Sequence, residues 1–124
     1  MRKPHPTLTP QELAIMKVVW AKGQVTVRDV HDALNESRPV AYTTVMTMMR
    51  ILQEKGYLTR AEQDRAHLYT PAMPQQKVVG AMLRDFVDRV FDGASDSLLL
   101  HLAKDNRLTA KQKRILAKLI DEEE

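Results

Sequence analysis

The sequence predicts a mainly α-helical protein with one small β-hairpin, divided into residues 1–72 and a purely helical region, residues 73–124. Three observations lead to this prediction. Helix start and stop signals divide the first part into three short amphipathic segments. Two short strand-like segments follow, with a polar turn between them. Beyond Pro74 the apolar residues recur with helical spacing only.

The first two helices are marked by capping residues. Thr9 and Glu12 have the spacing of a capping box, and Pro10 suits the first helical position. Gly23 can adopt the left-handed conformation that ends a helix, so we expect the first helix to stop there. After a short extended piece at Gln24 and Val25, Thr26 is expected to cap a second helix. This helix is expected to run from Val27 to about Glu36, because the residue before Pro39 avoids the helical region.

The third predicted helix, from Ala41 to Gly56, has two differently built faces. Its inward face is expected to carry Tyr42, Val45, Met48, Met49 and Leu52. Thr43, Thr47 and Arg50 point the other way, with Thr44 and Ile51 on the flank. Threonine is a mediocre helix former, so a threonine stripe suits a helix that lies in the DNA major groove. The alternative is an amphipathic core helix with an accidental threonine stripe.

Two strands and a turn complete the first part. Residues 57–62 and 67–70 have strand-like composition, and Gln63 to Ala66 form the polar turn, with Arg65 near its tip. The expected order is therefore helix, short strand, helix, helix, strand, turn and strand. That order is a winged helix-turn-helix, in which the hairpin is the wing.

The C-terminal region is expected to contain three short helices and to mediate dimerisation. The first helix stops near Gly93, the second begins at Ser95 or Asp96, and Thr109 opens the third with a capping box. An apolar region of only about 50 residues does not easily bury its surface alone, so we expect it to pair with a second copy. The alternative is a tail folded back on its own N-terminal domain. The candidate dimerisation residues are Val79, Met82, Leu83, Phe86, Val90, Phe91, Leu99, Leu102, Leu116 and Leu119.

The charge distribution agrees with a nucleic-acid partner for the first part only. The net charge is +3, and residues 1–72 contain ten Lys and Arg against seven Asp and Glu, whereas residues 73–124 contain nine of each. The absence of cysteine excludes disulfides and thiolate metal sites. No apolar run approaches the roughly 20 residues needed to span a bilayer, so we expect a soluble, cytoplasmic protein. We expect no cofactor, metal or catalytic activity, because the sequence carries no phosphate-binding glycine loop, nucleophile elbow or metal-ligand spacing.

The candidate DNA-binding residues fall into two groups. Those expected to read bases are Thr43, Thr44, Thr47 and Arg50. Those expected to contact phosphates or the edge of the interface are Tyr42, Arg38, Arg65, His67 and Arg28. Arg28 could instead pair with Asp29 or Asp32, His67 could merely pack, and the arginines could be ordinary solvated charges. Met46, Met48 and Met49 are interpreted as pliable core residues and not as metal ligands.

The sequence resembles the BlaI/MecI-type penicillinase repressor family. The likeness rests on Leu8 to Glu12 with Trp20, on residues 27–30, on residues 41–45, on residues 55–58 and on residues 65–69. It spans nearly all of residues 8–71, whereas residues 74–120 match in helix layout more than in residues. The resemblance implies a dimeric winged-helix repressor that covers a palindromic operator in double-stranded DNA. It also implies release by proteolysis, triggered by a membrane-bound sensor.

Two departures from the family leave the release signal open. Members that respond to β-lactams are cut at an Asn-Phe bond, and the matching position here is His101-Leu102. Copper-responsive members carry a C-terminal cysteine cluster, which this chain lacks. A repressor released by a small ligand bound to the C-terminal helices remains an alternative. So does a winged-helix adaptor that binds another protein and no DNA.

Overall fold

The computed structural model describes residues 8–105 and 107–123, with side chains up to residue 118. The chain folds into two compact units, Met1–Val79 and Gly80–Glu124. The division of the chain after residue 72 into a DNA-binding and a dimerisation region stays a prediction.

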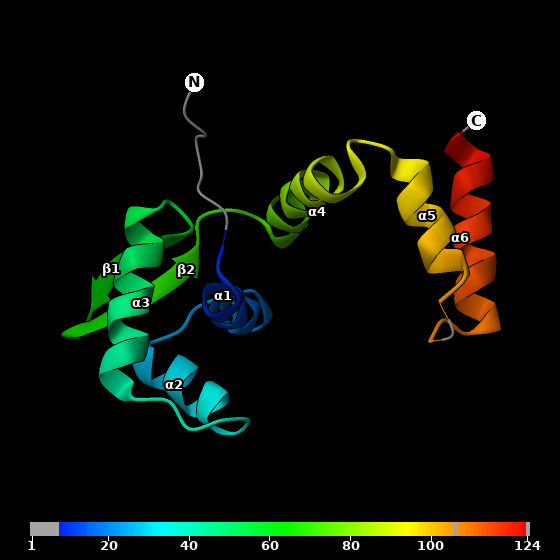
Figure 1. The fold of residues 1–124 in the computed structure, drawn as a ribbon. Coiled ribbons are helices and arrows are strands. Elements are labelled where there is room, and N and C mark those ends of the chain that lie inside the picture. Colours follow the sequence, from blue (N-terminus) through cyan, green and yellow to red (C-terminus); the bar gives the residue numbers. More distant parts are fainter. Residues whose placement is uncertain (1–7, 106, 124) are drawn as a thin grey trace. The chain divides into compact units, whose positions relative to one another are not determined.

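Before α4 (Gln75–Phe91) begins, the described residues of the N-terminal unit form three helices and a two-stranded antiparallel sheet (Figure 1). The helices are α1 (Pro10–Lys22), α2 (Val27–Asn35) and α3 (Tyr42–Glu54). The strands β1 (Leu58–Gln63) and β2 (Ala66–Pro71) form the hairpin. The predicted winged helix-turn-helix is confirmed, with element boundaries within about two residues of the expected ones.

Local capping starts two of these helices, whereas α3 begins without a side-chain cap. The Thr9 hydroxyl accepts the Glu12 N–H at 3.2 Å, and a Glu12 oxygen accepts the Thr9 N–H at 2.8 Å. Thr26 and Asp29 repeat this capping box at α2. The residue before α3 is Ala41, whose methyl group cannot accept a hydrogen bond. The first turn of α3 therefore depends on contacts from elsewhere in the fold.

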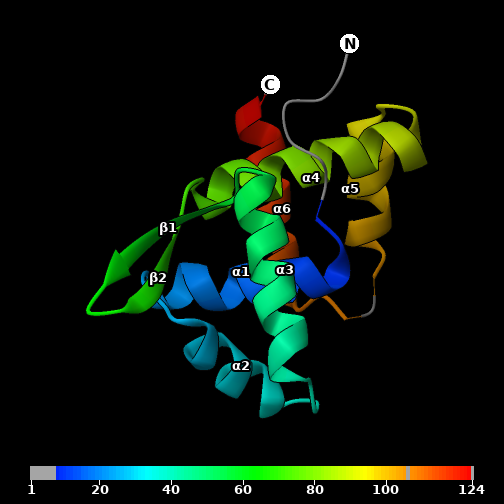
Figure 2. The same ribbon diagram turned by 90° about the vertical axis from the view of Figure 1, so that its left-hand side faces the viewer.

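The core of the N-terminal unit lies where α3 crosses α1 (Figure 2). The expected inward face of α3 is confirmed for Val45, Met49 and Leu52, which are fully buried, whereas Met48 is half-buried. Tyr42 was expected on this face, but its side chain is 41% exposed because the first turn of α3 projects beyond the core. The other fully buried side chains are Ile15, Met16, Val19, Val25 and Val30.

A buried ion pair joins the start of α1 to the end of α3. Lys55 Nζ lies 3.0 Å from Glu12 Oε1 and 2.8 Å from Oε2. The Glu12 side chain is only 6% exposed and that of Lys55 is 24% exposed. Burial alone would raise the pKa of Glu12, but hydrogen bonds from Lys55 and from the Thr9 N–H outweigh it, so the pKa lies below its ordinary value. Glu12 thus caps α1 and fixes the far end of α3 with one carboxylate.

The hairpin turn is tighter than expected. The sequence predicted a polar turn from Gln63 to Ala66, but only Asp64 and Arg65 connect the strands. Their φ angles are 52° and 66°, as in a type I′ turn, whose twist matches that of the two strands. Non-glycine residues rarely adopt positive φ, so the wing tip holds Arg65 in a strained conformation. At the base of the hairpin, Val25 and Tyr69 exchange backbone hydrogen bonds of 2.9 and 2.7 Å.

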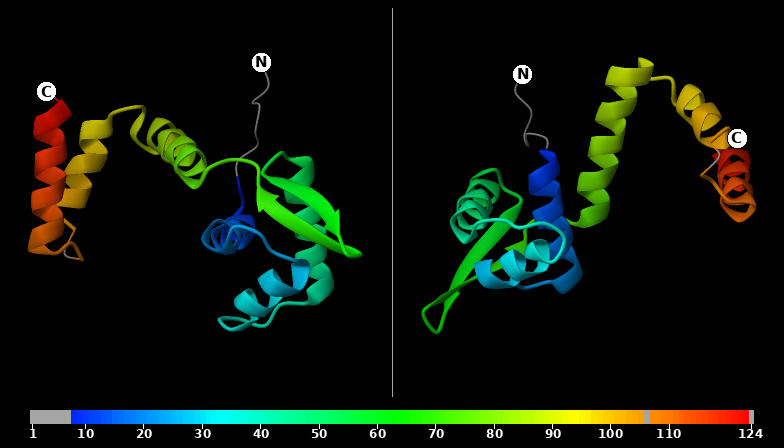
Figure 3. Two further views of the ribbon diagram at one scale, coloured as in Figure 1. Left: turned by 180° about the vertical axis from the view of Figure 1, so that it is seen from behind. Right: turned by 60° about the horizontal axis from the view of Figure 1, so that its bottom comes forward.

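The C-terminal region contains α4 (Gln75–Phe91), α5 (Ser95–Ala103) and α6 (Ala110–Glu123), as predicted. Thr109 and Gln112 form the expected capping box, with hydrogen bonds of 2.9 and 3.0 Å. Helices α5 and α6 lie side by side and run in opposite directions (Figure 3). Among the described residues, no helix combines the length and apolar character that crossing a membrane requires.

Candidate nucleic-acid interface

The solvent-facing side of α3 carries the residues expected to read DNA bases. Thr43, Thr44, Thr47 and Arg50 are all exposed, while the opposite side of the helix packs into the core. Short hydroxyl side chains let a helix approach a flat or grooved partner closely. The face therefore has the shape and polarity that direct contact with base edges requires.

Side chains of α2 hold the start of α3. Asn35 Oδ1 accepts the Val40 N–H at 3.1 Å, and His31 Nε2 lies 2.9 Å from the Val40 carbonyl oxygen. The His31 ring also packs edge-on against Tyr42, with ring centroids 5.7 Å apart. The Arg28 guanidinium lies 5.8 Å from the centre of the Tyr42 ring, in a cation–π arrangement. These contacts hold the residue that precedes the N-cap and the Tyr42 ring of the first turn against α2.

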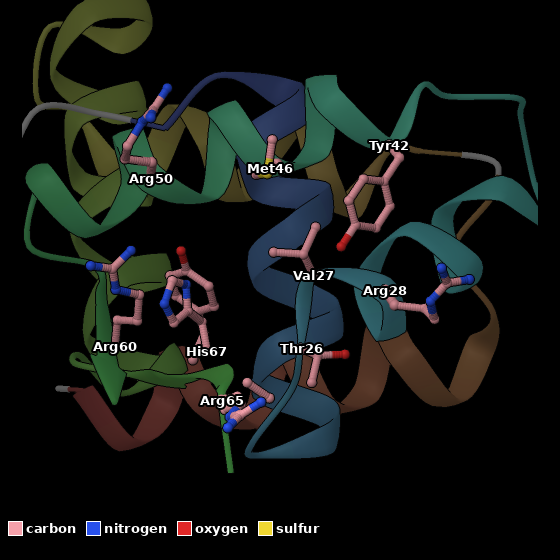
Figure 4. A pocket seen from close by; sticks show the side chains of 11 residues that line it. Thr26, Val27, Arg28, Tyr42, Met46, Arg50, Arg60, Arg65 and His67 are labelled. Atoms are coloured by element: carbon pink, nitrogen blue, oxygen red, sulfur yellow. The ribbon is translucent and has the colours of Figure 1, made fainter. Parts of the chain in front are cut away.

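A groove of about 440 Å³ lies between α2, α3 and the hairpin. Val27 and Tyr69 are buried side chains that line it, and the Tyr42 hydroxyl points toward its centre (Figure 4). Arg28 approaches from α2, whereas Arg60 and the other hairpin residues approach from the opposite side (Figure 4). The remaining residues that line the groove are Thr26, Met46, Arg50, Arg65, Ala66 and His67.

Strand alternation explains why the hairpin contributes charge to this groove. Arg60 is paired with Tyr69, and Glu62 with His67, so these four side chains lie on one face of the hairpin. Tyr69 is buried at the base of that face, and Arg60 and His67 line the groove beside it. Arg65 joins them from the turn. The face that packs on the core at Tyr69 thus carries Arg60, Glu62 and His67 toward its other end, with Arg65 beside them.

Among the described residues, the groove arginines form no ion pair with a carboxylate. Across the part of the chain that the structure describes, Arg28, Arg50, Arg60 and Arg65 have no carboxylate within 4.0 Å. The alternative pairing of Arg28 with Asp29 or Asp32 is therefore not observed. A guanidinium is always charged, so such a cluster attracts anions.

The groove brings together only some of the predicted DNA-binding residues. Arg28, Tyr42, Arg50, Arg65 and His67 line it. The remaining candidates lie outside it. Thr43, Thr44 and Thr47 lie on the exposed face of α3, and Arg38 is exposed in the loop before α3.

Six groove residues were not among the sequence candidates: Thr26, Val27, Met46, Arg60, Ala66 and Tyr69. Met46 was interpreted as core, but it is 45% exposed. The position of Arg60 follows from the strand register, which becomes clear only when the turn is known to have two residues.

The candidate dimerisation residues differ in exposure. Val79, Leu83, Phe86 and Val90 on α4 are exposed by 44, 51, 40 and 53%. The half-buried candidates are Met82, Phe91, Leu99, Leu102 and Leu116, and the side chain of Leu119 lies outside the described residues. Among the residues whose side chains the structure describes, no three His, Asp or Glu converge as metal ligands would.

Comparisons with known proteins agree with this arrangement. The model of the family described as penicillinase repressor matches residues 8–122. The transcriptional regulator BlaI of Mycobacterium tuberculosis is 35% identical over 95 residues, which are 75% of this chain and 69% of that protein. The penicillinase repressor of Bacillus licheniformis is 24% identical over 120 residues, covering 97% of this chain and 94% of that protein.

A solved structure extends the likeness to the fold. The solution structure of the Bacillus licheniformis BlaI monomeric form in complex with the blaP half-operator matches with a TM-score of 0.51 and 29% identity. The match covers 61% of this chain and 92% of that one. The resemblance read from the sequence is thereby confirmed. The chain belongs to the penicillinase repressor family, whose members are transcriptional repressors and not enzymes.

Proposed function

We propose that this chain is a sequence-specific transcriptional repressor that inserts α3 into the major groove of an operator. The observation that carries the proposal is the exposed face of α3, with three threonines and Arg50, opposite a side that buries Val45, Met49 and Leu52. Thr43, Thr44 and Thr47 can contact bases through hydroxyls and thymine methyl groups, and Arg50 can bind guanine. Each good contact discriminates by roughly 1–3 kcal/mol.

The surrounding basic residues are proposed to position the protein on the DNA. Arg28, Arg65 and His67 line the groove beside α3, and Arg38 is exposed in the loop before it. The Tyr42 hydroxyl is a further candidate donor to a phosphate. Such contacts fix orientation without selecting a sequence. The solved relative in complex with a half-operator supports this role for the N-terminal unit.

The functional form is proposed to be a homodimer on a palindromic operator. Val79, Leu83, Phe86 and Val90 follow a four-three-four spacing along α4, which is the spacing of a coiled-coil seam. All four are at least 40% exposed. A second copy of the same helix would cover them. The dimer is proposed to present two α3 helices to major grooves about one helical turn, roughly 34–36 Å, apart, or at another spacing set by the dimer.

Selection of bound fragments from random duplex DNA, followed by sequencing, tests the proposal directly. We expect an inverted repeat, and sedimentation of the complex should give two protein chains per duplex. Affinity should fall steeply with salt, by about 10³- to 10⁵-fold between roughly 50 and 200 mM if six to ten phosphates are contacted per dimer. An adaptor that binds only proteins would enrich no sequence and show no salt-dependent shift of duplex DNA at low ionic strength.

The release signal needs a separate experiment. The His101-Leu102 bond, at the family's cleavage position, lies inside α5. Proteases bind extended chain, so cleavage by a sensor-linked protease would require α5 to unwind there first. Blotting the chain before and after induction distinguishes the mechanisms. Fragments broken at this bond support proteolysis, whereas an intact chain with weakened operator binding supports release by a ligand.

A further inference from the structure

We propose that Met46 is a redox-sensitive modification site, at which two-electron oxidation of the thioether to a sulfoxide weakens operator binding. This inference rests on the proposed function and deepens it. It supplies a chemical signal for release of the operator that requires neither cleavage of the chain nor a ligand bound to the C-terminal helices.

The first argument is that Met46 exposes more of its side chain than the other described methionines. The Met46 side chain is 45% exposed, whereas Met16 and Met49 are completely buried. The other methionines with described side chains are half-buried, and they are Met48, Met73 and Met82. Because a thioether must meet the oxidant in solvent, Met46 is expected to react first.

The second argument is that no thiol competes for the oxidant. The sequence contains seven methionines and no cysteine. Cysteine thiolates are the usual sites of reversible oxidation in regulatory proteins, so in this chain sulfur-based sensing depends on methionine. Methionine sulfoxide is reduced again by dedicated reductases, and a regulatory switch requires such a reverse step.

The third argument is the position of Met46 on α3. Met46 follows Tyr42 by four residues and precedes Arg50 by four, so the three side chains form one row along the helix (Figure 4). This row lies at the edge of the exposed face that carries Thr43 and Thr47. A helix that enters the major groove with that face would bring the Met46 thioether close to the DNA. An apolar side chain at such a position can pack on a thymine methyl group.

Oxidation replaces this apolar contact by a polar group. With hypochlorous acid as the oxidant, the sulfur of Met46 loses two electrons and gains an S–O bond. The O–Cl bond of the acid breaks, its chlorine is reduced to chloride, and its proton goes to solvent. The side chain keeps its length, but it now carries a polar, chiral sulfoxide whose oxygen accepts hydrogen bonds.

Two effects of the sulfoxide oppose operator binding. Its oxygen is hydrated in the free protein, and packing it against DNA without a hydrogen-bond donor costs free energy. The oxygen is also an acceptor one helical turn from Arg50, whose guanidinium has no carboxylate within 4.0 Å among the described residues. A hydrogen bond between these two side chains would hold Arg50 along the helix and away from guanine.

Titration of the purified chain with hypochlorous acid tests the inference, with peptide mass spectrometry and binding to the selected operator as readouts. Met46 sulfoxide should form before the sulfoxides of the half-buried methionines. Operator affinity should fall in parallel, by roughly tenfold when Met46 is fully oxidised. Methionine sulfoxide reductases of both stereospecificities, supplied with a dithiol, should restore it. The added oxygen on Met46 in an intact chain distinguishes this route from release by a ligand.

Substitutions show whether Met46 is the responsible site, each variant being compared with its own untreated form. Met46→Leu keeps an apolar side chain of similar size without an oxidisable sulfur, so its operator affinity should not respond to the same dose. Met82→Leu is the matched control, because it removes a half-buried methionine of α4 and should leave the sensitivity of the wild type. Met46→Gln places a polar, uncharged side chain at the same position and should bind weakly without any oxidant.

Three outcomes would overturn the inference. The first is an oxidised Met46→Leu variant that loses operator affinity with the same dose response as the wild type. The second is a wild-type chain that carries Met46 sulfoxide quantitatively and binds the operator undiminished. The third is a loss of binding that coincides with a loss of helix content in circular dichroism, because the effect would then be unfolding.

Failure of the proposed function would look different. An untreated chain that binds every duplex alike, or none at low salt, would refute the sequence-specific repressor before any oxidant is added, and the redox site with it. Sequence-specific binding by the untreated chain that survives oxidation of Met46 would refute the redox site alone.

Discussion

Replacing Glu12 by glutamine should destabilise the N-terminal unit by about 2 kcal/mol. Both Glu12 oxygens lie within 3.0 Å of Lys55 Nζ, and the carboxylate is almost completely buried. Breaking a buried ion pair on one side typically costs about 3–5 kcal/mol, because the other charge is left unpaired. Lys55 keeps 24% of its side chain exposed and can regain water, which reduces the expected loss. Glutamine still accepts the Thr9 N–H, so the capping box survives.

The single tryptophan makes the measurement specific to this unit. Trp20 lies in α1, and its Nε1 donates a hydrogen bond of 3.0 Å to the Met73 carbonyl oxygen. Its fluorescence during urea or thermal unfolding therefore reports on the N-terminal unit. For a unit of this size, 2 kcal/mol corresponds to a fall in Tm of roughly 8–16 °C.

A double-mutant cycle separates the ion pair from other effects. Lys55→Met should also be destabilising, and the double variant Glu12→Gln/Lys55→Met should be destabilised by at least about 1 kcal/mol less than the two single variants combined. Additive effects, or a Glu12→Gln variant within about 0.5 kcal/mol of the wild type, would refute the reasoning.

The pH dependence gives an independent check on the same pair. The pKa of Glu12 is lowered in the folded state, so the pair stabilises the fold fully above the ordinary glutamate pKa of 4.5. That stabilisation is lost as the pH falls below 4.5 through the lower folded value. Between about pH 5 and pH 3 the stability of Glu12→Gln should therefore change less than that of the wild type.

Three further predictions concern the proposed DNA interface and the proposed dimer interface. Thr47→Ala should lower affinity for the selected operator by roughly 5- to 100-fold but leave binding to unrelated duplex unchanged in titrations; equal reductions would remove Thr47 from the readout set. Arg65→Gly should relieve the positive-φ strain at the wing tip and raise the urea midpoint by an amount equivalent to about 1 kcal/mol, while weakening binding to both DNAs. Leu83→Asp should make the chain monomeric in sedimentation experiments, because the substitution buries an unpaired charge in the proposed interface; an unchanged dimer would move that interface elsewhere.

The fold was predictable because its start and stop signals are local. Thr9, Thr26 and Thr109 open helices with side chains three residues away, and Gly23 and Gly93 adopt positive φ after helices, as expected. Each signal acts within a few residues, so the sequence pattern alone contains it.

The candidate site was only partly predictable, because its remaining members depend on contacts between distant segments. Arg60 enters the groove through its register with Tyr69, which a two-residue turn determines. Glu12 was read as a capping residue, and nothing near it in the sequence points to Lys55, 43 residues away. Helical periodicity placed Tyr42 inward because it cannot show where the core ends beneath a helix terminus.

The uncapped beginning of α3 has a consequence for how the helix meets its target. The side chains of His31 and Asn35 in α2 contact the backbone of Val40, two residues before α3. The start of α3 is therefore held by contacts with α2 and not by a capping side chain of its own. A shift of α2 would therefore be passed on to the first turn of α3 through Val40. Within α3, we therefore expect backbone amide exchange to be fastest in the first turn. Binding of an operator should slow that exchange.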